Sequence, residues 1–226
     1  MDILTDVSYI LSNLDSKYIS IVALSLYVSF IATFLSTIFS IYISSLLTIY
    51  DFRGKGLILL IINSLMSLPP VVVGLILYLI FSFSGVLGFL DILYTPTIMI
   101  IAQFIIITPI IISLSYKSLQ NSYFELREYL ISINTKKSKI IYTIIRECRF
   151  DLLIIVITGL GRALSEVGAV IIVGGNIANM TRVMTTSIVL ETSRGELALA
   201  LSLGLTLILL AILINILIYI VRRKYL

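Results

Sequence analysis

A basic and an acidic residue stand four positions apart inside a long apolar segment of this chain, within "GRALSEVGAVIIVGGN" (161–176). Arg162 and Glu166 share one face of a helix at this spacing and can neutralise each other. An ionised side chain at the centre of a bilayer costs about 2.5–3.5 kcal/mol on insertion scales. Because that cost is high, the pair indicates a functional site, interpreted here as a gate. A structural strut that locks two helices together is the alternative.

Small residues recur in the same segment, at Gly161, Ser165 and Ala169. On one continuous helix they would form a ridge that lets a neighbouring helix approach closely. A helix with both an ion pair and such a ridge is expected inside a bundle, away from lipid.

A run of hydrogen-bond donors follows, in "VGGNIANMTRVMTTSIVLETSRGELALA" (173–200). The two glycines end the helix or permit close backbone packing. Hydroxyl and amide groups beside a single arginine suit an oxyanion, which they bind without holding it as strongly as charge does. A solvated external loop is the alternative. Residues expected along a passage for an anion, besides the ion pair, are Gly168, Gly174, Gly175, Asn176, Arg182, Thr185 and Thr186.

Two adjacent prolines interrupt a second apolar segment, "SLMSLPPVVVGLILY" (64–78). Proline lacks the backbone donor and clashes with the preceding turn, so Pro69 and Pro70 predict a kink or break. Freed carbonyls at membrane depth must face protein or a watery cavity. The segment is therefore expected to be a bent, pore-lining helix, with a packing kink as the alternative. Pro109 predicts a milder kink in a third segment.

The composition places all of these residues in a membrane protein. Of the 226 residues, 59% are hydrophobic and 12% charged, and a soluble domain carries about 25% charged residues. With no His and one Cys, a His/Cys metal site is not expected. "DFRGKG" (51–56) lacks the spacing of a P-loop, so nucleotide binding by that route is not expected.

Five segments are long enough to cross about 30 Å of hydrocarbon as helices: about 18–49, 57–83, 97–117, 151–173 and 196–221.

The cations predict how these helices are oriented. Twelve of the sixteen Lys and Arg residues fall on one side of the membrane if the helices alternate. The positive-inside rule then places the N-terminus outside and the C-terminus in the cytoplasm. The basic surface is a topology signal, and nucleic-acid binding is the poorer interpretation. The predicted all-α protein is one transmembrane domain (1–226), with an external or interfacial segment 1–17, a cytoplasmic loop 118–150 and an external loop 174–195.

The cytoplasmic segment reads as a helix, a break at Asn134-Thr135 and a second helix. Apolar positions at Leu130, Ile133, Ile140, Ile141 and Ile144 lie among cations. An element of this size can dock into a groove of a partner protein. Alternatively, it lies on the inner leaflet with its lysines at anionic lipid.

Together, "LPPVVVGL", the cytoplasmic helix-turn-helix and "GRALSEVGAVIIVGGNI" closely resemble permease subunits of bacterial ABC importers. The nearest branch is that of molybdate, sulfate and tungstate. The cytoplasmic element sits where that superfamily has its EAA loop, a Glu, two small residues and then a Gly. Here Glu128 fits the Glu, Tyr129 and Leu130 replace the small pair, and Asn134 replaces the Gly. "IIRECRFD" (144–151) stands where most relatives have Leu-Pro, as in the tungstate-type permeases.

The resemblance spans roughly residues 57–210 and implies the fold of a type I importer permease. It implies a homodimer over two cytoplasmic ATPase subunits, which would use ATP and Mg²⁺, fed by an external oxyanion-binding protein. The chain would then be a non-enzymatic permease in the cytoplasmic membrane of a bacterium or archaeon. Tungstate or molybdate is the expected anion, and sulfate or another anion is the alternative. Coupling residues are expected at Glu128, Ser132, Asn134, Thr135, Lys136 and Lys137.

The sequence is less typical of two other protein classes. An ion channel or secondary transporter would be favoured by inverted repeats, and the five segments lack convincing internal symmetry. An intramembrane enzyme would need a catalytic cluster, but the Asp residues lie in loops or at helix ends, which leaves Glu166 with little help.

Overall fold

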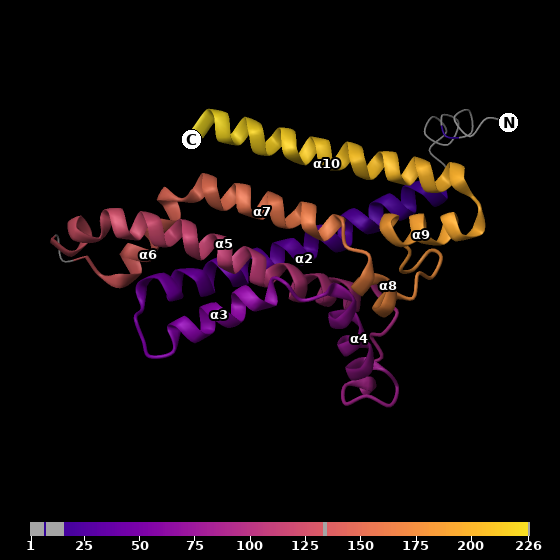
Figure 1. Ribbon diagram of the computed structural model, residues 1–226, viewed down its shortest axis with the longest axis horizontal. Helices are drawn as coiled ribbons and strands as arrows, with labels where there is room; N and C mark the ends of the chain where they lie inside the picture. The colour runs from indigo at the N-terminus through magenta and orange to yellow at the C-terminus, as the bar shows by residue number, and fades with distance from the viewer. Residues whose placement is uncertain (1–6, 8–15, 133–134, 226) are drawn as a thin grey trace.

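The computed structural model describes Val7, residues 16–132 and residues 135–225. This part of the chain contains helices and no strand, as the sequence predicts. Long helices run side by side along the molecule, with shorter ones toward its ends (Figure 1). The elements are α2 (Ser16–Ile49), α3 (Lys55–Leu65), α4 (Pro70–Phe81), η1 (Gly88–Leu90), α5 (Pro96–Ser132), α6 (Lys137–Glu147), α7 (Arg149–Leu164), α8 (Gly168–Gly174), α9 (Met184–Arg194) and α10 (Leu197–Tyr225). The predicted interfacial segment 1–17 lies almost wholly outside the described residues.

Three described helices, α2, α5 and α10, are each long and apolar enough to cross a membrane. Two more spans arise if α3 with α4, and α7 with α8, each count as one bent span. The prediction of five spans therefore agrees with the structure when two of them are broken. Helix α5 runs through Pro109 without a break and continues to Ser132, well past the predicted end at 117.

Helices α2 and α5 form the most extensive helix pair in the described chain. The face of α2 toward α5 carries small hydroxyl residues, which allow close approach of two backbones. Ser36 Oγ lies 2.9 Å from Thr108 Oγ1, and Ser40 Oγ donates to the Thr108 carbonyl oxygen at 3.3 Å. These hydroxyls are satisfied inside the protein, so the pair forms the rigid centre of the bundle. The buried hydroxyl residues of α2 include Ser25, Ser29, Thr33, Ser36, Ser40, Ser44 and Ser45.

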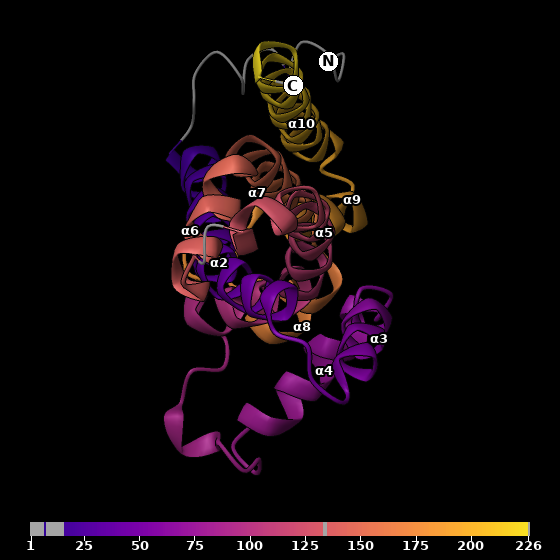
Figure 2. The same ribbon diagram turned by 90° about the vertical axis from the view of Figure 1, so that its left-hand side faces the viewer.

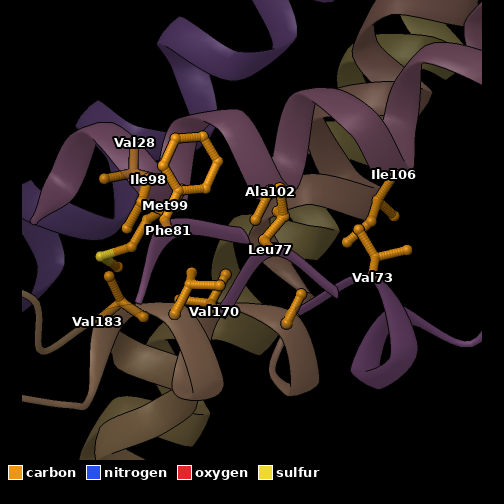
Figure 3. Close-up of a cluster of buried hydrophobic side chains, with 12 residues drawn as sticks. Val28, Val73, Leu77, Phe81, Ile98, Met99, Ala102, Ile106, Val170 and Val183 are labelled. Atoms are coloured by element: carbon orange, nitrogen blue, oxygen red, sulfur yellow. The ribbon is translucent and has the colours of Figure 1, made fainter. Parts of the chain in front are cut away.

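The main apolar cluster lies where α4, α5 and α8 meet (Figure 3). Ile98, Met99 and Ala102 of α5 are fully buried there. Leu77 of α4 and Val170 of α8 close the cluster from the other side. Neither α4 nor α8 is long enough to be stable alone. Their apolar side chains pack against α5, and this packing stabilises both short helices.

The two ends of the molecule differ in character. Helix α6 and the C-terminus lie at one end, and α8 and α9 lie toward the other (Figure 1). Seen from the α6 end, α10 lies at one edge and α3 and α4 at the opposite edge, with α2, α5 and α7 between them (Figure 2). The α6 end carries the cations of the 118–150 segment and the C-terminal arginines. This separation agrees with the predicted sorting of charge, and which end faces the cytoplasm stays a prediction.

Candidate functional site: two broken helices around Arg162 and Glu166

The fourth apolar segment breaks between the two charged residues. Helix α7 ends at Leu164 and α8 begins at Gly168, at an angle of 57°. The prediction of one helix over 151–173 is therefore wrong, and Gly161, Ser165 and Ala169 do not share one helical ridge. The break is built from polar contacts that the periodicity of the sequence does not reveal.

Glu166 connects the two halves of the broken helix. Arg162 Nη1 donates to Glu166 Oε2 at 2.9 Å, and Glu166 Oε1 accepts the N–H of Ala169 at 3.3 Å in the first turn of α8. A carboxylate near a helix N-terminus is favoured by the unpaired N–H groups and the helix dipole. The Glu166 carbonyl also accepts the Thr185 hydroxyl at 2.8 Å, which connects the break to α9. The expected ion pair exists, and its glutamate also holds the break together.

The two partners differ in exposure. The Glu166 side chain is 4% exposed and the Arg162 side chain 37%. The carboxylate is therefore held inside the protein, while more than a third of the arginine side chain is exposed. A partly accessible cation can attract an anion, whereas a lone carboxylate there would repel it.

Gln103 of α5 contacts the same break and was not selected from the sequence. Its Nε2 donates to the Ala163 carbonyl oxygen at 3.1 Å, a carbonyl at the end of α7. The side chain is buried, and its Oε1 has no hydrogen-bond partner among the described residues. The sequence feature that could have identified Gln103 is its position as a single amide in the apolar run "TIMIIAQFIII" (97–107).

The proline pair breaks the second apolar segment as predicted. Helices α3 and α4 meet at 98°, across Met66 to Pro69. Pro69 adopts an extended backbone and Pro70 is the first residue of α4. This follows from proline chemistry, since a residue before proline avoids the helical region and proline is tolerated at a first helical position.

The two breaks lie close together, which the sequence did not predict. Arg162 lines a cavity of about 50 Å³ together with residues of the α3–α4 break and of α5. That space could hold one or two water molecules. Beside it, a Cβ added at Gly168 would lie 2.5 Å from Val71 Cγ2. The lining residues are Leu65, Met66, Leu68, Val73, Ile105, Ile106, Pro109, Ile110 and Arg162.

The first halves of α4 and α8 pack backbone against backbone. A Cβ added at Gly74 would lie 2.7 Å from the Ala169 Cα. At the far end of α8, Gly175 has a φ of +67°, and an added Cβ would lie 2.7 Å from the Tyr94 ring. A residue with a side chain is disfavoured at Gly175 by both its backbone conformation and this contact. Gly175 was predicted from the sequence and Gly74 was not, and both allow a close approach to α8 or to its end.

The predicted external loop 174–195 is only partly a loop, because its second half is α9. Its donors mostly bind other protein groups. Asn176 Nδ2 donates to the Thr186 carbonyl at 3.2 Å, and Thr186 Oγ1 donates to Asn176 Oδ1 at 2.9 Å. Thr186 is fully buried and Thr185 nearly so. In this conformation these side chains fasten the loop to α9, and their contact with an anion stays a prediction.

A second buried ion pair lies in this region. Arg182 Nη1 is 3.7 Å from Glu191 Oε1, and Arg182 Nη2 donates to the Asn176 carbonyl at 3.3 Å. The side chains of Arg182 and Glu191 are both nearly fully buried. Glu191 was not selected from the sequence, where it reads as an ordinary polar residue of a helix.

The predicted coupling residues lie at the other end of the molecule. Glu128, Ser132, Lys136 and Lys137 are exposed, Thr135 is half-buried, and Asn134 lies outside the described residues. Helix α5 ends at Ser132 and α6 begins at Lys137, so the predicted break is found. Lys137 Nζ lies 4.5 Å from the centre of the Tyr50 ring, which fixes the start of α6 to the end of α2.

Three of the predicted apolar positions of this element face the protein itself, and Ile133 lies outside the described residues. Leu130, Ile140 and Ile144 are buried in a cluster with Leu119 of α5 and Cys148. They are therefore not free to enter a partner's groove. The outward surface instead combines polar residues with exposed aromatic rings, at Phe124, Tyr129 and Tyr142. Aromatic residues are common anchors at protein interfaces.

No family model matches the chain. The chain is 40% identical over 210 residues to the tungstate uptake system permease protein TupB of Peptoclostridium acidaminophilum, covering 93% of this chain and 92% of that protein. It is 37% identical over 195 residues to a probable anion ABC transporter permease protein of Haloferax volcanii, covering 84% of each. It is 36% identical over 190 residues to TupB of Campylobacter jejuni, covering 84% of this chain and 80% of that protein.

Proposed function

Since the chain belongs to the family of oxyanion ABC importer permeases, of the tungstate uptake type, we propose that it provides the membrane path for tungstate. Molybdate is the closest competitor, because both are tetrahedral dianions of similar size. The observation that carries the proposal is the 40% identity to a tungstate uptake permease over nearly the whole length of both proteins. Permeases of this family are multi-pass proteins of the bacterial or archaeal inner membrane and are not themselves enzymes.

The joint between the two broken helices is proposed as the gate. Its support is the meeting of both breaks beside Arg162, whose side chain is partly exposed. Helices α4 and α8, packed through Gly74 and Ala169, would move as one body relative to α3 and α7. Closure around the anion would then remake the contacts of Arg162, while Glu166 keeps the break intact. Hinges of this kind use a few residues at the ends of elements.

A homodimer is proposed as the working unit. Its support is the small number of spans, since five helices are few for an alternating-access path. The surfaces of α10 and of α3 and α4 are largely exposed in a single chain. Part of that apolar surface would contact the second copy and the rest would contact lipid.

The energy source is proposed to be a pair of partner ATPase subunits that bind ATP and Mg²⁺. An ABC uptake permease works with ATPase and binding-protein subunits in general. The outward surface of the end of α5 and the start of α6, with Glu128 at its centre, is the proposed docking surface. Its support is the combination of exposed charge and exposed aromatic rings at one end of the bundle.

The test is transport by the reconstituted system. The chain, its ATPase and its binding protein would be placed in liposomes, and uptake of tungstate, molybdate and sulfate would be measured with and without ATP. We expect ATP-dependent tungstate uptake that molybdate inhibits more strongly than sulfate does. Sulfate uptake that exceeds tungstate uptake would assign the chain to the alternative substrate. Uptake by the chain alone, driven by an ion gradient, would refute the ABC mechanism in favour of a secondary transporter or channel.

A further inference from the structure

A polar pocket of about 460 Å³ lies at the α6 end of the molecule, away from the two helix breaks. Residues of α5, α7 and the last turns of α10 line it, and it is open on one side. The proposed gate gives this pocket no role. Its lining residues are Leu114, Lys117, Ser118, Asn121, Ser122, Glu125, Asp151, Ile154, Ile155 and Arg222.

The lining changes from apolar to polar along one direction. On α5 it runs from Leu114 through Lys117 to Glu125, a distance of about 16 Å at 1.5 Å per residue. On α7 it runs in the opposite chain direction, from Ile155 to Asp151. An aqueous ion would gain nothing from the apolar part of this groove. An amphiphile would match both parts, because its chain and its headgroup need different surroundings.

Three of the four charged residues of the pocket lie at the ends of apolar runs of the sequence, and Glu125 lies further along α5. Lys117 follows the apolar part of α5, Asp151 precedes the apolar part of α7, and the candidate span of α10 ends at Arg223, next to Arg222. Charged side chains at span ends lie at the level of lipid headgroups. The pocket is therefore at the depth where a phosphate of the bilayer surface would be found.

The charges also indicate the type of headgroup. Two cations, Lys117 and Arg222, are balanced by two carboxylates, Asp151 and Glu125. Asp151 Oδ2 accepts the hydroxyl of Ser118 at 3.1 Å, which holds it on the α5 side of the groove. No ion pair is found for either cation within the described residues. A zwitterionic headgroup, with one phosphate and one ammonium, complements both signs.

We propose that this groove binds a phospholipid with a zwitterionic amine headgroup. The lipid phosphate contacts Lys117 and Arg222, the ammonium contacts Asp151 and Glu125, and an acyl chain lies along Leu114, Ile154 and Ile155. The bound lipid joins the end of α10 to α5 and α7. The inference goes beyond the proposed transport function and does not depend on which anion is carried.

The test is lipid binding to the purified, delipidated full-length chain. Phosphatidylethanolamine, phosphatidylglycerol and inorganic phosphate would be titrated separately, with thermal unfolding and native mass spectrometry as readouts. We expect phosphatidylethanolamine to bind and stabilise most, and inorganic phosphate to have no comparable effect. The double variant Lys117→Gln/Arg222→Gln should bind this lipid about a hundredfold more weakly, since it removes two charge-assisted contacts that are each worth about a factor of ten.

The matched control removes two cations outside the pocket. Lys139→Gln/Arg223→Gln has the same charge change, with one residue adjacent to Arg222, and should bind the lipid within about twofold of the unmodified chain. An equal loss in this control would overturn the proposal in favour of general surface attraction. Equal stabilisation by inorganic phosphate would overturn it in favour of a free anion site.

A carboxylate variant tests the headgroup assignment. It also keeps the proposal testable if the cation variant does not fold. Asp151→Asn leaves the groove net positive, so the preference should shift toward phosphatidylglycerol by about fivefold or more. Stronger binding of phosphatidylglycerol by the unmodified chain would refute the zwitterionic assignment. If the cation variant binds lipid as well as the unmodified chain but changes from a dimer to a monomer, the groove would instead be a contact surface for a second copy of this chain. None of these outcomes depends on transport, so failure here and failure of the proposed function are distinguishable.

Discussion

At the scale of single residues, Glu166 has more contacts than its sequence position indicates. It neutralises Arg162, accepts the N–H of Ala169 and, through its carbonyl, accepts the Thr185 hydroxyl. A buried charge is tolerated only when it is paired and hydrogen-bonded. The carboxylate is therefore part of the structure of the break, while the role of Arg162 toward an anion stays a prediction.

Substitutions of the ion pair separate a gate from a strut. Glu166→Gln keeps an acceptor for Ala169 but leaves Arg162 unpaired, so unfolding free energy should fall by about 2 kcal/mol, less than for a fully buried pair because Arg162 is partly exposed. Arg162→Gln should cost more, since it leaves the buried carboxylate alone. The double variant should regain stability while anion uptake stays low. Paired measurements of melting and uptake check this, and recovery of both would leave the pair as a strut.

Gln103 offers a second residue-scale prediction. Gln103→Leu leaves the Ala163 carbonyl without its amide donor, which should lower stability by about 1 kcal/mol. The loss is limited because the variant also removes the unpartnered Oε1. Gln120→Leu is the matched control, as Gln120 is an exposed residue of the same helix. Thermal unfolding of both variants decides the matter, and equal destabilisation would mean that the contact with Ala163 contributes nothing.

At the scale of elements, short helices that cross at a glycine make the site possible. Helices α4 and α8 are too short to cross a bilayer singly, and each would complete a span only together with the helix that precedes it. Their approach depends on Gly74, where no side chain fits against the Ala169 backbone. The angle between the halves of each span is therefore set by packing as well as by the break itself.

Replacing glycine by alanine should change the stability of the protein in opposite directions at two helical positions. Gly74→Ala should destabilise, because the Ala169 backbone must move to admit a methyl group. Gly204→Ala in α10 meets nothing within 4 Å and should stabilise by about 0.5–1 kcal/mol through helix propensity. Melting temperatures of the two variants would show the contrast. A gain in stability at Gly74 would contradict the close contact of α4 with α8.

The coupling element yields a prediction on energy transfer. Glu128→Lys reverses an exposed charge on the proposed docking surface and should leave the permease folded while ATP hydrolysis proceeds with little uptake. Glu147→Lys is the control, since it makes the same change at an exposed position on α6 outside residues 125–140. ATP hydrolysis and uptake would be measured together. Normal uptake in the Glu128 variant would favour a helix that merely rests on the inner leaflet.

At the scale of the whole molecule, charge and architecture divide the protein into two ends. The cationic end holds α6, the proposed ATPase surface and the lipid groove, and the opposite end holds α8 and α9 (Figure 1). This arrangement places the proposed gate between the two ends. The anion would thus enter at one end of the helix bundle, and the ATPase subunits would move the bundle from its other end.

Orientation in the membrane can be measured by labelling single cysteines. In a Cys148→Ser background, Lys137→Cys and Arg223→Cys should react only from the cytoplasm, and Asn179→Cys only from outside. Asn13→Cys, which lies outside the described residues, should also react from outside. Labelling of Lys137→Cys in intact cells by an impermeant reagent would invert the assigned topology.

The sequence by itself determined the class of protein, the five apolar segments and the residues of the ion pair. These follow from local chemistry, because hydropathy, proline and charge act through neighbours in the chain. Tertiary structure alone decided that α7 ends between Arg162 and Glu166, that this break meets the one at Pro69 and Pro70, and that Gln103 faces it. Contacts between segments distant in the chain fix those features, and apolar periodicity carries no record of them. For the same reason, the groove between α5, α7 and α10 became visible only when the ends of three spans came together.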